Sequence, residues 1–265
     1  MPTPAAAEIY SVYWLYQVDP AWRRLTGAER DLGKRAFLDA LDARDPSVTL
    51  RGAYSLVGLR PDADLFLWTH GPDLDAIQRL AVALGHSGLG TYLTPAHTYV
   101  GSVAAARYDP EHKPAFVRGV APRDYVSMYP FTKTPDWYLL PYDERRALMA
   151  AHGQLGQRHT DPGAHGRVST AGTSNGHGRG RSVAATAAAP GATALATTGG
   201  ILTNTVDSFG LSDYEFVVAF EADDAASLCR MVEDLRAVEV RRYTRADTPV
   251  FLGRRREPAE VLADL

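Results

Sequence analysis

Side chains able to do chemistry lie close together near the middle of the chain. Tyr129 and Lys133 belong to the run Tyr-Pro-Phe-Thr-Lys, and His152 follows the aromatic-rich segment 137–142. A neutral imidazole can bind a metal ion, whereas a tyrosine in an aromatic run is more often packed in a core and a lysine is more often exposed. The sequence therefore places side chains able to do chemistry in one region without fixing their roles.

His152 has two possible interpretations from spacing alone. It falls at helical spacing from Leu148 and Met149, so the three residues share one face of an expected helix. A lone histidine on an apolar face is more often a hydrogen-bonded core residue than a ligand. Gly153 directly after it would let a flat group or another backbone come close. Both interpretations stay open at this point.

The segments that must position these groups alternate between strands and helices. Aromatic and β-branched runs favour strands, and apolar stripes at helical spacing favour helices. The first half is expected to contain strands 10–18, 54–59, 64–69 and 98–104 and helices 21–41 and 72–84. The expected stripe of the first helix is Trp22, Leu25, Leu32, Phe37 and Leu41.

The later part of the chain repeats this order. A helical stretch at 136–158 is followed by a Gly-Leu turn at 210–211, a strand at 214–221, a helix at 223–235 and a strand starting at 239–243. The same Gly-Leu turn occurs at 58–59. This similarity predicts two related α+β halves. The alternative is that any two hairpin-and-helix units look alike.

Residues 159–200 break the pattern because they are rich in Gly, Ala, Ser and Thr. Such a composition buries too little apolar surface to offset its ordering entropy, so we expect a mobile surface insertion. His165 and His177 lie within it, but their spacing matches no familiar metal site.

Composition excludes several classes of protein. The 265 residues carry a formal net charge of −3, which gives no electrostatic argument for binding nucleic acid or an anionic membrane. No apolar run approaches the roughly 18 residues of a membrane span, and the first residues do not form a secretory signal. Cys229 stands alone in an apolar-periodic helix, so we expect a buried thiol and a reducing, cytoplasmic location.

Together, the motifs resemble the signature of the chlorite dismutase-like family. The resemblance covers nearly the whole chain outside residues 159–200. It rests on Val18-Asp-Pro-Ala-Trp-Arg-Arg24, Gly58-Leu-Arg-x-Asp-Ala-Asp64, Tyr129-Pro-Phe-x-Lys, Trp137-Tyr-Leu-Leu-Pro, Glu144-Arg-Arg, Met149-x-x-His152-Gly, Asn204-Thr-Val-x-Ser-Phe-Gly-Leu-x-Asp-Tyr-Glu-Phe-Val-Val-Ala-Phe-Glu-Ala-Asp and Leu235-Arg-x-x-Glu-x-Arg-Arg-Tyr243.

The resemblance implies an α+β fold, a ferredoxin-like dimeric α/β barrel built of two related halves. It implies an N-terminal half without haem at 1–107 and a C-terminal haem-binding half at 108–265 that contains the insertion. It also implies assembly of identical chains, usually as a homopentamer.

By the same resemblance, His152 is the proximal iron ligand. Glu239 matches a carboxylate that would accept a hydrogen bond from the other ring nitrogen of His152. A salt bridge from Glu239 to Arg241 or Arg242 is the alternative. The resemblance assigns the porphyrin pocket to Met128, Lys133, Trp137 and Thr203.

Within the family, the residue at position 203 separates the activities. Chlorite-splitting members have an arginine there, and Thr203 supplies no positive charge. The segment Glu111-His112-Lys-Pro-Ala-Phe116 instead resembles the actinobacterial type of coproheme decarboxylase, with His112 as the base that takes a proton from hydrogen peroxide. Tyr129, as a ring that can lose one electron, would be oxidised and would take hydrogen from a propionate, while Lys133 would hold a substrate carboxylate. The alternatives are a solvated His112 in a polar loop, a Tyr129 packed in the core and an exposed Lys133. The implied reaction turns two propionates of coproheme (Fe-coproporphyrin III) into vinyl groups and yields haem b.

Two alternatives stay open. One is a haem peroxidase or chlorite-degrading enzyme, and the other is a haem sensor or carrier without turnover. Both would share the His152 ligand, so only the products formed from coproheme and peroxide separate them.

Overall fold

The strands form one sheet that closes into an uneven ring. The computed structural model describes residues 8–103, 113–160 and 200–265. Within these ranges the ring runs in the order β7-β6-β4-β1-β3-β2-β9-β5, β5 pairs back to β7, and β8 is attached to β5. The strands are β1 (Ile9–Val18), β2 (Thr49–Ser55), β3 (Leu65–Gly71), β4 (Leu93–Val103), β5 (Tyr125–Lys133), β6 (Leu202–Asp207), β7 (Phe216–Ala222), β8 (Thr244–Ala246) and β9 (Phe251–Arg256).

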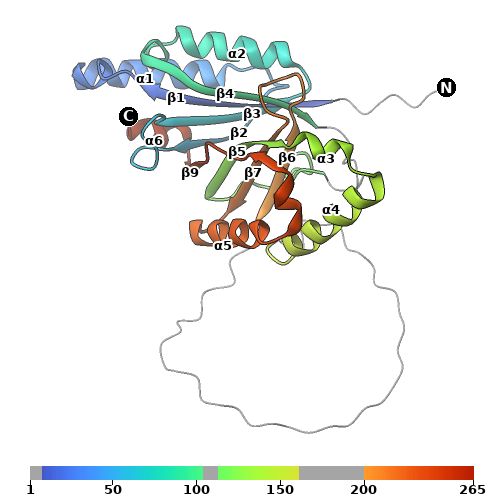
Figure 1. Ribbon diagram of the computed structural model, residues 1–265. Helices are drawn as coiled ribbons and strands as arrows, with labels where there is room; N and C mark the ends of the chain where they lie inside the picture. Colours follow the sequence, from blue (N-terminus) through green and yellow to red (C-terminus); the bar gives the residue numbers. More distant parts are fainter. Residues whose placement is uncertain (1–7, 104–112, 161–199) are drawn as a thin grey trace, which may run out of the picture.

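Helices cover the ring on its outside. Figure 1 shows α1 and α2 on one side of the sheet and α4 and α5 on the other. The helices are α1 (Gly27–Asp42), α2 (Leu74–His86), α3 (Pro135–Leu139), α4 (Tyr142–Gln157), α5 (Ala225–Arg236) and α6 (Pro258–Ala263), with short 3-10 turns η1 (Trp22–Arg24), η2 (Leu89–Tyr92) and η3 (Glu239–Tyr243).

The order of elements occurs twice, which confirms the expected α+β barrel of two related halves. The first half runs β1, α1, β2, β3, α2, η2, β4, and the second runs β5, α4, β6, β7, α5, η3, β8. The repeated Gly-Leu turn has the same backbone in both, since Gly58 has φ +76° and Gly210 has φ +72°. Glycine takes this left-handed conformation without steric cost. The expected boundary between the halves, at 107–108, lies outside the described residues.

Alternation along the strands separates an interior from an outer face. One buried cluster draws side chains from all eight strands of the ring, so it fills the interior of the barrel. Its aromatic rings stack on one another, with centroids 5.2 Å apart for Tyr13 and Trp68 and 4.9 Å apart for Tyr54 and Phe66.

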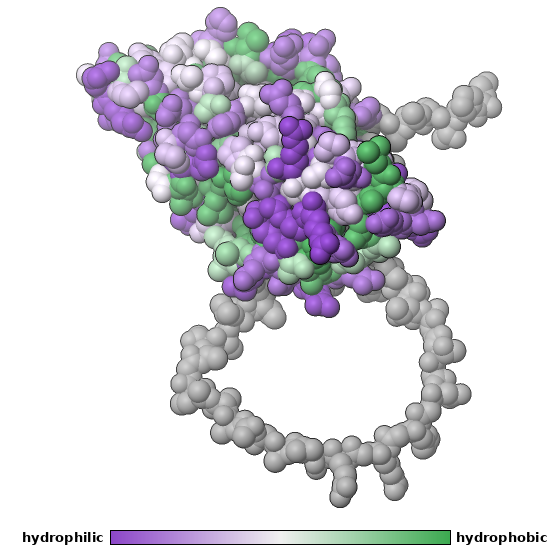
Figure 2. Space-filling model, viewed as in Figure 1, coloured by the Kyte–Doolittle hydropathy of each residue, from purple (hydrophilic) through white to green (hydrophobic). Residues whose placement is uncertain are grey.

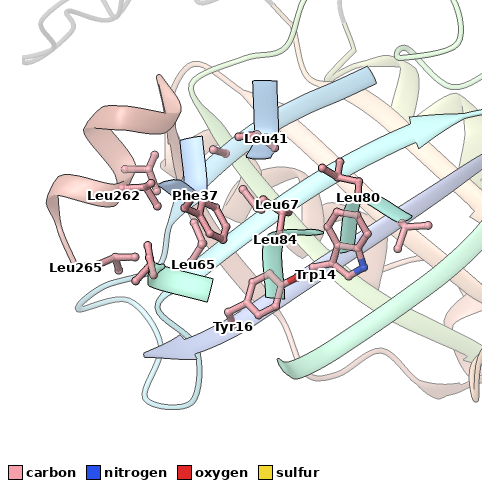
Figure 3. Packing of buried hydrophobic residues seen from close by; sticks show 14 of the residues in the cluster. Trp14, Tyr16, Phe37, Leu41, Leu65, Leu67, Leu80, Leu84, Leu262 and Leu265 are labelled. Atoms are coloured by element: carbon pink, nitrogen blue, oxygen red, sulfur yellow. The ribbon is translucent and has the colours of Figure 1, made fainter. Parts of the chain in front are cut away.

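The outer face of the first half is filled by side chains from its own helices. Figure 3 shows Phe37 and Leu41 of α1, Leu80 and Leu84 of α2, and Leu262 after β9 converging with the strand residues. The indole nitrogen of Trp22 donates to the backbone oxygen of Leu265 at 3.1 Å. This face therefore has an apolar core, beside a hollow lined in part by Trp14, Tyr16 and Phe37.

Prolines and turns shift several element boundaries from the sequence expectations. The helix expected at 136–158 is broken because Leu140 precedes Pro141 and takes an extended conformation. The strand expected at 54–59 ends at Ser55, because the backbone turns back at Leu56. Residues 239–243 form η3, and the strand follows at β8.

Three expectations about the first helix and the cysteine were wrong in detail. The helix at 21–41 divides into η1 and α1, because Thr26 and Glu29 form a capping box that starts a new helix. Leu32 is 64% exposed and takes no part in the buried stripe. Cys229 is exposed, since it lies on the outward face of α5.

Gly90 is expected to be the glycine least tolerant of substitution in the first half. A Cβ at Gly90 would lie 1.7 Å from the backbone oxygen of Leu84, whereas one at Gly85 would meet nothing within 4 Å. We expect Gly90→Ala to lower the free energy of unfolding by about 3 kcal/mol, and Gly85→Ala to leave it unchanged or raise it by up to about 1 kcal/mol. Urea unfolding of both variants measures the difference; equal stabilities would contradict this packing.

Candidate active site

Tyr129 and Thr203 lie on the outer face of the second half. In the paired strands, Tyr129 is opposite Val218 and Thr203 is opposite Phe220. Val218 and Phe220 belong to the apolar cluster beneath α5, not to the barrel interior. Tyr129 is half-buried, and its ring lies 6.1 Å from the ring of Phe220. The sheet therefore presents a tyrosine and a threonine toward the helices α4 and α5.

His152 projects from the inward face of α4 as a neutral imidazole. Its Nδ1 atom is buried and has no hydrogen-bond partner within the described residues. Burial lowers the pKa of His152, and the nearby charge of Lys133 lowers it further. A buried and unprotonated ring nitrogen is the form of histidine that binds a metal ion.

Helix α4 lies loosely on the second half. Its inward-facing Leu148, Met149 and Leu155 are only half-buried, and none of its 16 residues is fully buried. Helix α1, in the equivalent place of the first half, buries Phe37 and Leu41 completely. An amphipathic helix gains most of its stability by packing its apolar face. A flat apolar group lying against α4 would complete this packing, and His152 faces that place.

Lys133 is a buried cation beside the same helix. Its Nζ atom lies 4.4 Å from the centre of the Trp137 ring and 5.1 Å from that of Phe131. Burial lowers the pKa of Lys133 to about 8; Glu215 opposes this shift and Arg241 adds to it. At neutral pH the site therefore contains a dehydrated positive charge that can hold a carboxylate.

Glu215 connects the elements around Lys133. Its Oε2 atom accepts hydrogen bonds from the backbone nitrogen of Lys133 at 2.7 Å and from the Tyr138 hydroxyl at 2.6 Å. Sequence reasoning assigned Glu215 no role, although it stands in the quoted Asp-Tyr-Glu-Phe run. Its contacts fix the end of β5 relative to α3.

A charge cluster lies close to the Tyr129 ring. Asp247 accepts hydrogen bonds from Arg236 and Arg241, each at 2.8 Å. Burial raises the pKa of Tyr129, Asp247 raises it further, and the two arginines oppose this. The phenol therefore stays protonated at neutral pH. Sequence reasoning named Arg241 only as a possible partner of Glu239 and assigned Asp247 no role, since Asp247 stands after β8, outside the quoted motifs.

Polar residues also surround a hollow after α5. It is lined by Arg236, Ala237, Val238, Glu239, Arg241 and Arg242. Figure 2 shows strongly hydrophilic residues gathered in the middle of the visible face, over the segment that follows α5. The second half thus has a positively charged border beside its site.

The structure does not bring all the expected residues together. Met128 was expected in the pocket, but it is fully buried in the barrel interior, because it alternates with Tyr129 along β5. Glu239 is exposed, and its Oε1 atom lies 3.7 Å from Arg242 Nη1. This is the salt bridge that was expected as the alternative role of Glu239. Glu239 does not form a hydrogen bond with His152 Nδ1. Trp137 is buried beside Lys133.

Some expectations fall on residues that the structure does not describe. His112, the expected base, and His165 and His177 lie outside residues 8–103, 113–160 and 200–265. Within those ranges, no group of three or more His, Cys, Asp or Glu side chains could hold a metal ion by itself. In the same ranges, no helix has the length and apolar character needed to cross a bilayer.

Fold and geometry together define a class: a two-half α+β barrel with a candidate site on the outer face of its second half. The family model described as chlorite dismutase matches residues 30–171 and 190–256. The chain belongs to the chlorite dismutase family.

Individual relatives agree with this assignment. The chain is 31% identical over 222 residues to a protein named coproheme decarboxylase from Mycolicibacterium smegmatis, covering 83% of this chain and 79% of the relative. It is 29% identical over 170 residues to one of the same name from Staphylococcus carnosus, covering 57% and 68%. The chlorite dismutase of Candidatus Nitrospira defluvii in complex with imidazole has the same fold, with a TM-score of 0.74 at 20% identity over 97% of this chain and 94% of that one.

Proposed function

We propose that this protein converts coproheme to haem b by oxidative decarboxylation of two propionates, with hydrogen peroxide as the oxidant. The observation that carries the proposal is that the buried cation Lys133 lies close to His152 and stands four residues from Tyr129 along β5, on the same side of the strand. The two relatives named coproheme decarboxylase support the choice of substrate.

His152 would hold the iron of the substrate through a ring nitrogen. The residues fit this role, because the imidazole is neutral and α4 leaves apolar surface for a flat ring to cover. Glu239 could fix the ring only if η3 brought it to Nδ1, since its present partner is Arg242. We retain that contact as a proposal for the loaded enzyme.

Lys133 would hold a propionate of coproheme. A desolvated ammonium attracts a carboxylate more strongly than an exposed one, since the local dielectric is low. Trp137 and Glu215 keep Lys133 in place on two sides. Lys133 therefore orients the substrate with a propionate toward Tyr129.

Tyr129 would carry the oxidising step. The phenol loses one electron and one proton, and the resulting radical takes a hydrogen atom from the β-carbon of a propionate. Loss of a second electron releases carbon dioxide and leaves a vinyl group. Each propionate thus gives up two hydrogens in total, and one hydrogen peroxide is reduced to two waters. When bound, the iron of the substrate passes these electrons to peroxide. His112 is proposed as the base that takes the peroxide proton.

Thr203 argues against chlorite as the substrate. Its hydroxyl is one of the side chains that β6 presents on the outer face, and it provides no cation to stabilise an oxyanion. Haem peroxidase activity and haem binding without turnover are the remaining rivals.

A titration followed by turnover tests the proposal. Ferric coproheme and haem b are added separately to the protein, and the Soret band is followed. We expect tighter binding of coproheme, because its additional carboxylates can pair with Lys133. Loaded protein is then given peroxide or chlorite. Vinyl formation with peroxide supports the proposal; oxygen release from chlorite, or an unchanged porphyrin, contradicts it.

Coproheme affinity is expected to fall as the pH rises above 8. Lys133 has a pKa of about 8 in the free protein, and a bound carboxylate would raise it. Binding therefore needs the protonated form, and Kd should increase by up to about tenfold per pH unit above 8. Soret titrations at pH 7, 8 and 9 measure this. In Lys133→Met the increase should disappear; an unchanged profile would exclude Lys133.

We further propose that identical chains assemble, as pentamers, and that the protein is cytoplasmic. Exposed apolar side chains at Val57, Leu59, Phe209 and Leu211 flank the repeated Gly-Leu turns of both halves and suit contacts between copies. Light scattering measures the mass of the assembly.

A further inference from the structure

A buried charge network lies inside the barrel, apart from the site on the outer face. Glu221 of β7 has no exposed surface and shares a face with the interior residues of its strand. Its carboxylate accepts hydrogen bonds from Arg51 Nε at 3.1 Å and Nη2 at 2.9 Å, from Asn204 Nδ2 at 2.9 Å and from the backbone of Arg123 at 3.0 Å. Residues from both halves therefore meet at this carboxylate.

The backbone of β2 directs Arg51 toward Glu221. The pairing of β2 with β3 shifts register between Leu50 and Gly52, so Arg51 occupies a β-bulge. Bulges re-aim a side chain and are found near functional sites. A buried ion pair is by itself weak evidence for stability, because desolvation offsets much of the attraction. The role of the network is therefore better inferred from the residues that its hydrogen bonds fix in position than from its contribution to stability.

The network holds the described part of the segment that joins the two halves. Phe116 N donates to Asn204 Oδ1 at 3.0 Å, Ala115 N donates to the backbone oxygen of Thr203 at 3.2 Å, and the backbone oxygen of Val120 accepts from Arg51. The Phe116 ring packs 5.7 Å from that of Trp68. Both side-chain functions of Asn204 are used, one on the segment and one on Glu221.

This segment lies where the ring of strands is weakest. β4 and β6 are paired only at Ser102 and Asp207, so β6 has no β4 partner at Thr203. The backbone of Ala115 takes that place instead. Because Thr203 faces the same surface as Tyr129, residues 113–120 border the candidate active site.

We propose that Asn204 is a positioning residue: with Glu221 and Arg51 it fixes residues 113–120 against β6 beside Thr203, and so shapes the side of the site where peroxide meets coproheme. The peroxide part of this inference rests on the proposed function, whereas the fixing of the segment does not. Asn204 touches neither coproheme nor peroxide in this account.

Hydrogen exchange on the ligand-free protein tests the fixing. We expect Asn204→Ala to speed exchange of the amides in 113–120 by about tenfold or more, because Phe116 N loses its acceptor. The matched control is Thr69→Val, which removes another fully buried side-chain hydrogen bond, from Thr69 Oγ1 to the backbone oxygen of Val12 at 3.4 Å. Thr69 alternates with Trp68 along β3, so its side chain points away from the barrel interior and from Phe116. Equal exchange of 113–120 in both variants would overturn the proposal.

Peroxide kinetics test the consequence. In coproheme-loaded Asn204→Ala we expect the second-order rate constant for peroxide to fall about tenfold, while the Kd for coproheme changes less than about threefold. Thr69→Val should change neither. A change in Kd as large as that in the rate constant would indicate a general structural effect and overturn the positioning role.

A measurement on the wild-type protein keeps the test decisive if the alanine variant does not fold. The amide of Phe116, which donates to Asn204 Oδ1, should exchange at least about tenfold more slowly than in an unstructured peptide of the same sequence. Exchange at the rate of the unstructured peptide would refute the hydrogen-bond explanation. If wild-type protein does not bind coproheme, the proposed function fails, but hydrogen exchange still decides whether Asn204 fixes the segment.

Discussion

Replacing Tyr129 with phenylalanine should leave coproheme bound and nearly abolish vinyl formation. The phenylalanine ring keeps the contact with Phe220, but without the hydroxyl the ring cannot lose an electron together with a proton at neutral pH. We expect the decarboxylation rate to fall on the order of 1000-fold, equivalent to about 4 kcal/mol in the barrier. Stopped-flow spectroscopy of loaded protein mixed with peroxide measures this rate.

Tyr125 provides the matched control for Tyr129. It lies on the same strand and packs against the same outer cluster, so Tyr125→Phe removes an equivalent hydroxyl. We expect its rate to stay within about threefold of wild type. If the two variants lost activity equally, or if Tyr129→Phe formed vinyl groups at the wild-type rate, the radical step would have to be abandoned.

Replacing His152 with alanine should remove the iron ligand while leaving the fold intact. The side chain is only half-buried, and no residue of α4 belongs to a closed core, so the helix has little packing to lose. We expect the Kd for ferric coproheme to rise about 100-fold, equivalent to about 2.7 kcal/mol. Soret titration gives the affinity, and added imidazole should restore part of the ligand spectrum.

The control for His152 is His159, a second histidine just after the end of α4. His159 pairs with Asp234 at 2.7 Å, and His159→Gln can retain that hydrogen bond. Its coproheme affinity should match wild type within about threefold. A spectrum of His152→Ala identical to that of wild type would show that another group binds the iron.

Local sequence patterns predicted which elements exist better than where they end. The strand at β1 follows from its aromatic and β-branched run, and the helices α2 and α5 follow from their apolar stripes. Boundaries depended on single residues: the Leu140–Pro141 step divides a helix, and Thr26 with Glu29 starts one. The exposed Leu32 shows that a stripe does not reveal how far the covering partner extends.

The candidate site could be predicted only in part. Which side chains reach it depends on the face of the strand that each residue occupies and on partners that are distant in sequence. Resemblance pointed to Met128 and Tyr129 together, yet neighbours on a strand face opposite sides, and Met128 fills the barrel interior. Glu221 meets Arg51 across 170 positions of sequence, and no local pattern predicts that pair. His152 was accessible to sequence reasoning because its helix carries its own amphipathic pattern.

A comparison of the two halves gives a physical reason for a single site. In the first half, Phe37, Leu41, Leu80 and Leu84 are buried between sheet and helices. In the second half, α4 buries nothing completely and presents His152. On the proposed function, the porphyrin would enter where α4 has left its packing incomplete.

The mass of the porphyrin after reaction tests the central claim most directly. Wild-type protein loaded with ferric coproheme is given peroxide, and the extracted porphyrin is analysed by mass spectrometry at successive times. Two consecutive losses, each of one carbon dioxide and two hydrogens, are predicted, ending at haem b. Coproheme of unchanged mass after the peroxide is consumed would contradict the account.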